Sequence, residues 1–411
     1  MTNKTNRLLI IFSCSMIGIS FLLDSSQSLY HGMKAIIFES SILITDYIEV
    51  GGIGAAILNA SILSLIASIL IQKSDAEMSG TGLGAVFLMF SFGLFGKDVY
   101  NIISILIGGY LFSRVKHISF GKVVHIVLLA TSFAPIVTEI SFFTTLPPII
   151  AIPLANFTGI LVGFFIVPVA NHLYDTHKGF NLYNVGFAIG ILGTLFVSIM
   201  KSYGHIPKSR VLVSSGNNLF FTIFLSALFL VMLIVATTRD KDAWKKYRKL
   251  IHETGYEDND FYLKYGIYTV LINMAINGFV SLFYVLIVAR GDLTGPSIGG
   301  ILTVVGFSGK GKHFRNIIPI YIGVVLGGMT KSWTIDQPAL LFAALFGTAL
   351  APISGYYGFF WGIVASFINS SVALNSGQLH AGLNLYNTGF SVGIVAAVLV
   401  PLLEAFNVKH K

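Results

Sequence analysis

The chain has 411 residues, of which 55% are hydrophobic and only 11% are charged, and its mean hydropathy is +0.80. Soluble globular proteins carry roughly 25% charged residues, so the composition excludes that class and indicates an integral membrane protein. The net charge of +8 does not indicate nucleic-acid binding, because Lys and Arg lie between apolar segments. The single cysteine, Cys14, excludes a disulfide framework and a multi-cysteine metal site, and we expect neither a metal ion nor a cofactor.

Apolar segments of about the 20 residues needed to cross a bilayer recur along the chain. Their continuity predicts an all-α polytopic membrane protein and argues against an outer-membrane barrel, whose strands alternate apolar and polar residues. The first segment also has signal-peptide character, but no cleavage pattern follows it cleanly, so we expect a retained helix. The segments are 7–23, 50–72, 121–144, 147–170, 180–200, 218–237, 265–289 and 382–403.

The chain repeats part of itself. Residues 79–108 align without a gap with 294–323, with eleven identities in thirty positions, and 177–190 align with 380–393, with nine in fourteen. The matches keep the same order in both halves, which indicates duplication. We therefore expect an N-terminal helix with a short apolar segment, a first repeat, a connecting helix with a charged cytoplasmic linker, a second repeat and a tail, at residues 1–46, 47–200, 201–264, 265–405 and 406–411.

The positions of Lys and Arg predict the orientation, because positively charged loops tend to stay cytoplasmic. If 33–46 dips into the membrane without crossing it, the two repeats have inverted topology, as in many transporters. Lys201, Lys208 and Arg210 then fall on the outer side, which leaves parallel repeats as an alternative. The charges expected inside are the linker and Lys4, Arg7, Arg114, Lys116, Lys122, Lys310, Lys312, Arg315, Lys409 and Lys411.

Residues 80–95 and 294–308 are short for a membrane crossing and predict broken or re-entrant half-helices, with ordinary helices extended by loops as the alternative. Both begin with capping residues, and we expect their N-termini to meet near the midplane and bind an anion or a dipolar solute. Glycines four residues apart predict close helix packing. Lys97 and Lys312 are interpreted first as loop charges that set topology, and second as recruiters of an anion. The pathway candidates at the two N-termini are Thr81, Gly82, Thr294 and Ser297.

The segments "GFNLYNVGFAIG" and "GLNLYNTGFSVG" each place a tyrosine between two asparagines. Buried amides need partners, so the asparagines either link neighbouring helices or line a pathway and replace the hydration of a polar solute. His177 and His380 precede the motif and are interpreted as interface caps, with a proton relay as the alternative. The pathway candidates are Asn181, Tyr183, Asn184, Asn384, Tyr386 and Asn387.

Acidic residues among apolar neighbours are costly and point to function. Glu139 is the first candidate for a coupling-ion site and Glu39 the second, although Glu139 could simply border a loop. The matching stretches "FAPIVTEI" and "LAPISGYY" add Thr138 and Ser354 as pathway candidates. Asp46, with Glu49 three residues later, predicts a helix start.

The duplicated NLYN-x-GF motif and the length near 400 residues resemble an uncharacterised bacterial family of multi-pass membrane proteins. A more distant resemblance is to urea transporters, which have two repeats, half-helices and a central pore for a small neutral solute. Their glycine, Tyr-Asn and glycine pattern is similar to Gly179, Tyr183, Asn184 and Gly190, and to the equivalent residues of the second copy, with the last spacing off by one. Their proline-threonine motif is similar to Pro135 and Thr138, but Pro352 is followed by Gly355, and the proline expected before phenylalanine is missing in both halves.

The sequence therefore predicts a transporter or channel of the cytoplasmic membrane for a small polar solute or anion, working between two pseudo-symmetric repeats. The alternatives are an ion-coupled secondary transporter that uses an intramembrane Glu, and a non-transporting membrane scaffold. We expect no enzyme, because the sequence lacks a nucleotide-binding loop and the common hydrolase motifs. The expected partners are the lipid bilayer, the solute and, as one option, a second copy of the chain.

Overall fold

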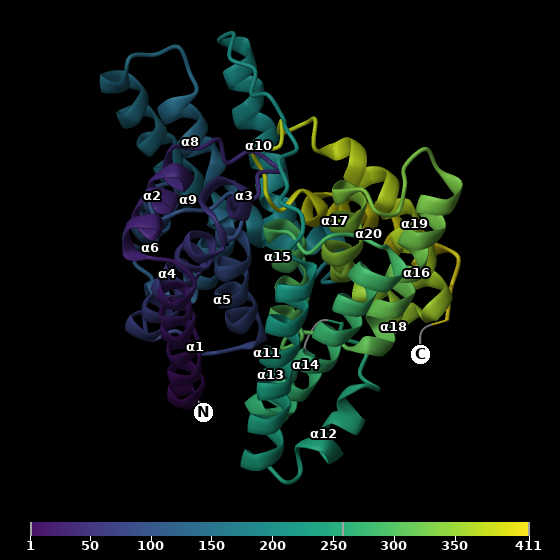
Figure 1. Ribbon diagram of the computed structural model, residues 1–411. Helices are drawn as coiled ribbons and strands as arrows, with labels where there is room; N and C mark the ends of the chain where they lie inside the picture. The colour runs from purple at the N-terminus through teal and green to yellow at the C-terminus, as the bar shows by residue number, and fades with distance from the viewer. Residues whose placement is uncertain (1, 257–258, 410–411) are drawn as a thin grey trace.

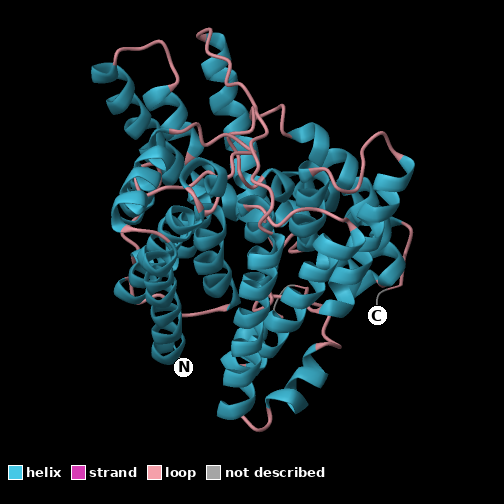
Figure 2. Cartoon of the chain, viewed as in Figure 1, coloured by secondary structure: helices cyan, strands magenta, loops and turns pink. Residues whose placement is uncertain are grey.

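The computed structural model describes residues 2–256 and 259–409. In these residues the chain is helical, and its only extended pairing is a single bridge between Thr45 and Leu212 (Figure 2). The predicted all-α architecture is thus confirmed for this part of the chain. Lys411, one of the charges expected at the cytoplasmic face, lies outside it.

The first half of the chain forms ten α-helices. They are α1 (Thr2–Leu23), α2 (Ser26–Phe38), α3 (Tyr47–Gly51), α4 (Ile53–Lys73), α5 (Gly80–Gly93), α6 (Ile103–Val115), α7 (Val124–Ala130), α8 (Pro135–Phe142), α9 (Pro148–His177) and α10 (Asn184–Ser202), with short 3-10 turns η1 (Phe120–Lys122) and η2 (Thr131–Phe133).

The second half repeats this order of elements, so that each helix of the first half has a counterpart ten numbers later. The elements are α11 (Asn218–Arg239), α12 (Ala243–Leu250), α13 (Phe261–Tyr265), α14 (Ile267–Phe283), α15 (Gly295–Phe307), α16 (Phe314–Thr330), α17 (Pro338–Leu345), α18 (Ala351–Tyr357), α19 (Phe359–Ser376) and α20 (Asn387–Ala405), with a π-helical turn η3 (Tyr284–Val288) and a 3-10 turn η4 (Phe346–Leu350).

Within the described residues, nine helices are long and apolar enough to cross a membrane, which indicates a multi-pass membrane protein. The segment predicted at 121–144 is instead two helices that meet at a 44° bend. Two crossings, Pro338–Tyr357 and Phe359–Ser376, escape the sequence analysis because their hydropathies of 1.6 and 1.2 are low. Most of Pro338–Tyr357 is buried inside the protein, as are Ser366, Asn369 and Ser370 of Phe359–Ser376, so these positions need not be apolar.

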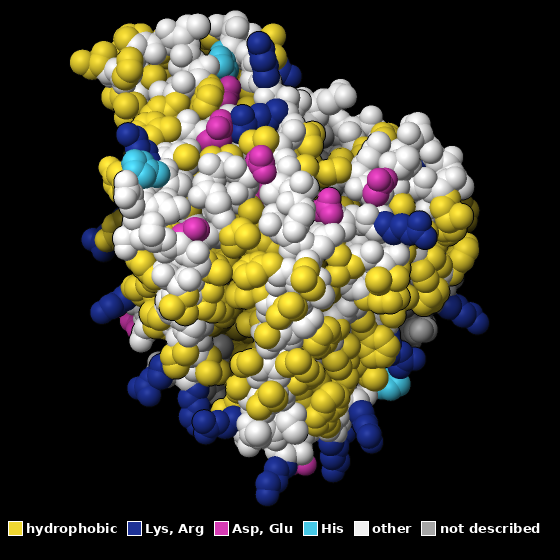
Figure 3. All heavy atoms as spheres, in the orientation of Figure 1, with side chains coloured by type: hydrophobic (Ala, Val, Ile, Leu, Met, Phe, Trp, Pro, Cys, Tyr) yellow, Lys and Arg dark blue, Asp and Glu magenta, His cyan; other side chains and the backbone are white. Residues whose placement is uncertain are grey.

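The surface agrees with this assignment. Figure 3 shows hydrophobic side chains across the middle of the visible face, and many Lys and Arg side chains along its lower rim. The N-terminus and the linker helix α12 lie at this lower end in Figure 1. The sequence placed both segments on the cytoplasmic side.

Equivalent helices pack on equivalent neighbours: α1 lies on α4 and α11 on α14, while α6 lies on α9 and α16 on α19. Helices α10 and α20 pack on each other between the halves. Their glycines allow the close approach that the sequence predicted, since Gly186 lies against Tyr386 and Gly393 against Phe187.

The half-helices α5 and α15 lie side by side at the buried centre (Figure 1). Gly80 at the start of α5 lies against Gly309 just beyond the end of α15, whereas Gly295 at the start of α15 lies against Leu94 just beyond the end of α5. The two helices are therefore antiparallel over their whole length. The expectation that their N-termini meet near the midplane is wrong, because side-by-side antiparallel packing puts the two N-termini at opposite ends of the pair.

The offset between the numbers of equivalent residues in the two halves changes by one residue just before these helices. The α4 span has 21 residues, whereas its counterpart, α14 with the π-helical turn, has 22. A π-helical turn accommodates one extra residue within a helix. Equivalent positions are therefore 214 residues apart in the stretch before this turn and 215 apart in the half-helices and the loops that directly follow them.

Candidate functional site

Each half-helix has its N-terminus closed by an aspartate that belongs to the other half. Asp46 caps α3 through the Ile48 N–H and also accepts from the Gly295 N–H, at 3.1 Å, and from the Ser214 N–H and hydroxyl. Asp260 caps α13 through the Leu263 N–H and accepts from the Gly80 N–H at 2.9 Å. A carboxylate at a helix N-terminus satisfies unpaired N–H groups and the helix dipole. The helix ends that the sequence predicted to be open are therefore occupied.

The capping residues predicted from sequence are present at the same two ends. The Ser79 hydroxyl accepts from the Gly82 N–H, and Thr294 with Ser297 forms a capping box. Burial raises the pKa of both Asp46 and Asp260, and the N–H groups that bind the two carboxylates oppose this shift.

The opposite ends of the half-helices are each held by an asparagine amide. Asn59 donates to the carbonyls of Gly93 and Lys97, at 2.8 and 2.7 Å, and Asn273 donates to those of Ser308 and Lys312, at 2.8 and 2.6 Å. These bonds satisfy carbonyls that lack helical partners and fix the loop that follows each half-helix.

A second pair of asparagines closes the same two loops. Asn101 bridges the Asp98 N–H and the Gly96 carbonyl, and Asn316 does the same between the His313 N–H and the Gly311 carbonyl. The two loops thus have the same backbone arrangement, which positions the lysine that each one carries.

Those two lysines, Lys97 and Lys312, are fully buried. Both lysines lie in loops, as expected, but neither ammonium reaches solvent, and their role as charges that set topology stays a prediction. The Lys312 ammonium donates to the hydroxyls of Tyr183 and Thr348 and lies 4.3 Å from the Tyr183 ring centroid. The Lys97 ammonium lies 3.6 Å from the Met89 sulfur and 4.9 Å from the Phe92 ring centroid.

The two tyrosines of the repeated motif meet between these lysines. The ring centroids of Tyr183 and Tyr386 are 4.7 Å apart, and both side chains are at most 2% exposed. Tyr183 packs edge-on against Phe307 of α15, and Tyr386 packs in the same way against Phe92 of α5. The structure therefore brings together the two motif tyrosines, the two half-helices and the two lysines.

Two of the four motif asparagines, Asn184 and Asn387, bond to residues of their own half. Asn184 donates to the Ala170 carbonyl and bonds His177, and Asn387 donates to the Ala373 carbonyl and bonds His380. Their partners are those expected of helix-linking amides. The other two differ: the Asn181 amide reaches across to the Gly389 carbonyl at 3.3 Å, whereas the Asn384 side-chain nitrogen has no partner among the described residues.

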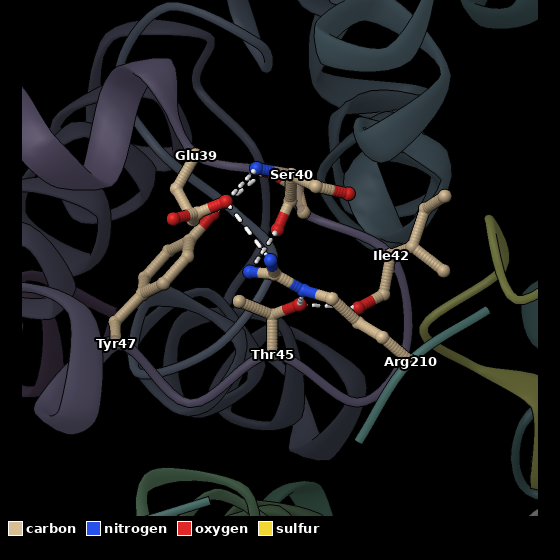
Figure 4. Close-up of polar contacts among 7 residues, drawn as sticks. Glu39, Ser40, Ile42, Thr45, Tyr47 and Arg210 are labelled. Carbon is tan, nitrogen blue, oxygen red and sulfur yellow. Dashed lines mark hydrogen bonds and ion pairs between the residues drawn. The ribbon is translucent and has the colours of Figure 1, made fainter. Parts of the chain in front are cut away.

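Glu139 and Glu39, the two coupling candidates, lie near one another at the end of the molecule where α15 begins. Glu139, only 4% exposed, bonds His205 at 2.8 Å, and Glu39 forms an ion pair with Arg210 at 3.0 Å. Figure 4 shows the Arg210 guanidinium between the Glu39 carboxylate and the Thr45 hydroxyl, to which it donates. A pocket of about 530 Å³ opens here, lined in part by Ser40, Glu139, His205, Lys208 and Arg210.

A series of hydrogen bonds connects the neighbourhood of this pocket to the loop of Lys97. The Ser41 hydroxyl bonds Tyr47 at 2.9 Å and Thr138 at 3.4 Å, and Thr138 accepts from the Asn101 amide at 3.1 Å. Asn101 holds the backbone of Asp98, the residue after Lys97. These buried side chains lie between the neighbourhood of the pocket and the backbone of the loop that carries Lys97.

The remaining pathway candidates lie apart from one another. Thr294 and Ser297 line a smaller pocket of about 160 Å³ with Asp292 and Asp336. Thr81 and Gly82 are at the other end of the half-helix pair, where Gly82 faces His125. Ser354, in α18, packs against Gly362 of α19.

Sequence reasoning missed Asp46 and Asp260 as paired caps, Asn59 and Asn273, and the burial of the two lysines. The aspartate and asparagine pairs lie 214 residues apart, so the gapless alignment at 215 residues hid them. Lys97 and Lys312 are identical within that alignment. The sequence signal for their burial was a lysine repeated at the same position after each short apolar segment.

Among the residues that the structure describes, no group of three or more His, Cys, Asp or Glu side chains could hold a metal ion. One family model, described as "Protein of unknown function (DUF1576)", matches residues 25–202 and 239–405. The matched segments run from α2 to α10 and from α12 to α20, so they leave out the equivalent helices α1 and almost all of α11. No curated protein and no solved structure matches the chain, and the resemblance to urea transporters rests on the quoted residues alone.

Proposed function

Because the chain belongs to the DUF1576 family, whose description assigns no activity, we propose its function from its own residues. It is a transporter or channel of the cytoplasmic membrane that passes a small polar solute or anion between two inverted, pseudo-symmetric repeats. The proposal gives the chain no catalytic role.

One observation carries this proposal: two equivalent half-helices lie antiparallel at the buried centre, and each is closed by an aspartate of the other half. Short helices and irregular loops at membrane depth are tolerated where they are buried in protein or line a cavity, and transporters with inverted repeats place their sites there. A plain scaffold has no need for buried lysines in both of the loops that follow these helices.

A second candidate is transport coupled to a proton or cation through Glu139 or Glu39. The bond between Glu139 and His205, beside the pocket of about 530 Å³, favours Glu139. Glu139→Gln is expected to abolish any proton dependence of uptake while preserving passive flux. Unchanged pH dependence in this variant would eliminate Glu139 as the coupling site.

Flux through the purified full chain tests the main proposal. In proteoliposomes, stopped-flow light scattering measures reswelling in urea and glycerol, and in potassium chloride, nitrate and formate with valinomycin present. At least one solute is expected to enter faster than in protein-free liposomes. No acceleration for any of them would leave the scaffold alternative.

A matched pair of variants locates the pathway. Tyr183→Trp together with Tyr386→Trp enlarges both rings at the contact between the halves and is expected to slow the flux. Leu195 of α10 is 58% exposed, and Leu195→Trp is expected to leave the flux unchanged. Equal fluxes in both variants, with both proteins monodisperse on size exclusion, would place the pathway elsewhere.

Cysteine labelling tests the inverted topology. Val115 and Thr330 are equivalent exposed positions at the ends of α6 and α16. In a Cys14→Ser background, Val115→Cys and Thr330→Cys are expected to react with an impermeant maleimide from opposite sides of the membrane. Reaction from the same side would establish parallel repeats.

A further inference from the structure

The buried ammonium groups of Lys97 and Lys312 have no acidic counterpart close by. Among the described residues, no carboxylate oxygen lies within 4.0 Å of either one. The nearest acid in sequence, Asp98, accepts through Oδ1 from the backbone N–H groups of Tyr100 and Asn101, and its buried Oδ2 has no partner among the described residues. A buried charge needs compensation, and a lysine at membrane depth is costly unless it is paired. Each half of the duplicated chain nevertheless keeps one.

The surroundings of Lys97 leave hydrogen-bonding groups unused. The ammonium of its counterpart Lys312 donates hydrogen bonds to the Tyr183 and Thr348 hydroxyls, whereas among the described residues the Lys97 ammonium has only the weak acceptor Met89. Tyr386, which corresponds to Tyr183, is 1% exposed, and its hydroxyl has no partner within the part of the chain that the structure describes. An ammonium and a phenol hydroxyl are both donors, and together they suit an anion.

Building on the proposed transport function, we infer that the permeant is a small monovalent anion, coordinated at Lys97 with the Tyr386 hydroxyl. Lys312 with the Tyr183 hydroxyl is the equivalent position of the second half. The anion supplies the negative charge that both ammonium groups lack. The Tyr183 and Tyr386 rings, whose centroids are 4.7 Å apart, pack against each other between the two positions, so passage of the anion requires the rings to separate.

The first position lies on the side of an open pocket. Glu139, His205, Lys208 and Arg210 line this pocket, and the buried, hydrogen-bonded side chains of Ser41, Thr138 and Asn101 lie between its neighbourhood and the Lys97 loop. On the other side, Gly255 of the linker packs directly against Gly311, next to Lys312. In this proposal an anion reaches the position at Lys97 from the pocket when the buried side chains between them move apart.

The experiment compares anions with neutral solutes in proteoliposomes containing the full chain. Potassium chloride, nitrate and formate with valinomycin are expected to enter at least tenfold faster than urea and glycerol. Lys97→Met is expected to lower anion entry at least tenfold. Lys116→Met, which removes an exposed lysine, is the control and is expected to leave anion entry unchanged.

Tyr386→Phe keeps the test decisive if Lys97→Met fails to fold. The hydroxyl that it removes has no protein partner in the described residues, so thermal stability is expected to stay the same while anion entry falls several-fold. Entry of urea or glycerol without entry of anions would overturn the inference and leave the transport proposal intact. Anion entry unaffected by Lys97→Met or by Tyr386→Phe would also overturn it, whereas no entry of any solute would remove both.

Discussion

The loops of Lys97 and Lys312 have the same backbone bonds but different side-chain partners. Asn59 and Asn273 hold the two loops through equivalent carbonyls, and both lysines are completely buried. The Lys312 ammonium is bonded to two hydroxyls, whereas within the described part of the chain Lys97 has only the Met89 thioether and the Tyr386 hydroxyl has no hydrogen-bond partner. Duplication has therefore preserved the contacts that build the fold, while the polar contacts around the two ammonium groups have diverged.

The two loops also differ in what covers them. Beyond Lys312, the linker covers the loop, with Tyr256 stacked on Phe180 at 4.1 Å. Beyond Lys97, a charged pocket is open to solvent. The two equivalent loops thus differ in what lies beyond them.

The largest effect that distinguishes the halves is expected at the paired aspartates. Asp46 accepts from four donors, and Asp260 accepts from two N–H groups and lies 4.0 Å from Lys310. Asp46→Ala is expected to cost about 4 kcal/mol of unfolding free energy and Asp260→Ala about 2 to 3 kcal/mol, because buried donors lose a charged acceptor. Thermal unfolding in detergent measures the difference, and Glu49→Ala, outside both networks, is the control. Equal losses would show that the two caps are equivalent.

The motif asparagines come next. Asn387 has an additional partner, the Ser376 hydroxyl at 2.8 Å, beyond those that it shares with Asn184. Asn387→Leu is expected to destabilise by about 3 kcal/mol and Asn184→Leu by about 2 kcal/mol, through lost amide bonds. The yield of monodisperse protein and its melting temperature report this. Stable variants with lost flux would instead favour the pathway interpretation.

Replacing each lysine by methionine separates their structural roles. Lys312→Met deprives the Tyr183 hydroxyl of its ammonium partner and is expected to cost about 1 to 2 kcal/mol. Lys97→Met places an apolar chain of similar length among apolar neighbours, so its stability is expected to be unchanged or slightly higher. Melting temperatures of the two variants, measured side by side, decide the matter. A larger loss for Lys97→Met would reveal a partner that the described contacts do not contain.

The smallest difference in stability between the two halves is expected for the tyrosine variants. Tyr183→Phe removes a hydroxyl bonded to Lys312 and is expected to cost about 1 kcal/mol, while Tyr386→Phe should fall within about 0.5 kcal/mol of the parent chain. The same unfolding assay shows which variant loses more stability if both are measured against the parent chain in one experiment. Reversal of the order would contradict the asymmetry described above.

Several features were predictable because they depend on local chemistry. The capping residues Ser79 and Thr294 occupy the predicted helix starts, and Gly186 and Gly393 lie at close contacts as their spacing indicated. Asp46 caps a helix as expected. What the sequence could not supply was the second bond of that carboxylate, to Gly295, because its donor lies 249 residues away.

The amino-acid sequence by itself determined a helical membrane protein made of two related halves, since hydropathy and repetition are properties of the chain alone. Only the tertiary structure decided that the half-helices lie side by side, that each is closed by the other half, and that Lys97 and Lys312 are buried beside the tyrosine pair. The physical reason is that burial and pairing depend on which distant segments come into contact, and a lysine between two apolar helices has the same local sequence whether its loop faces water or the centre of the bundle.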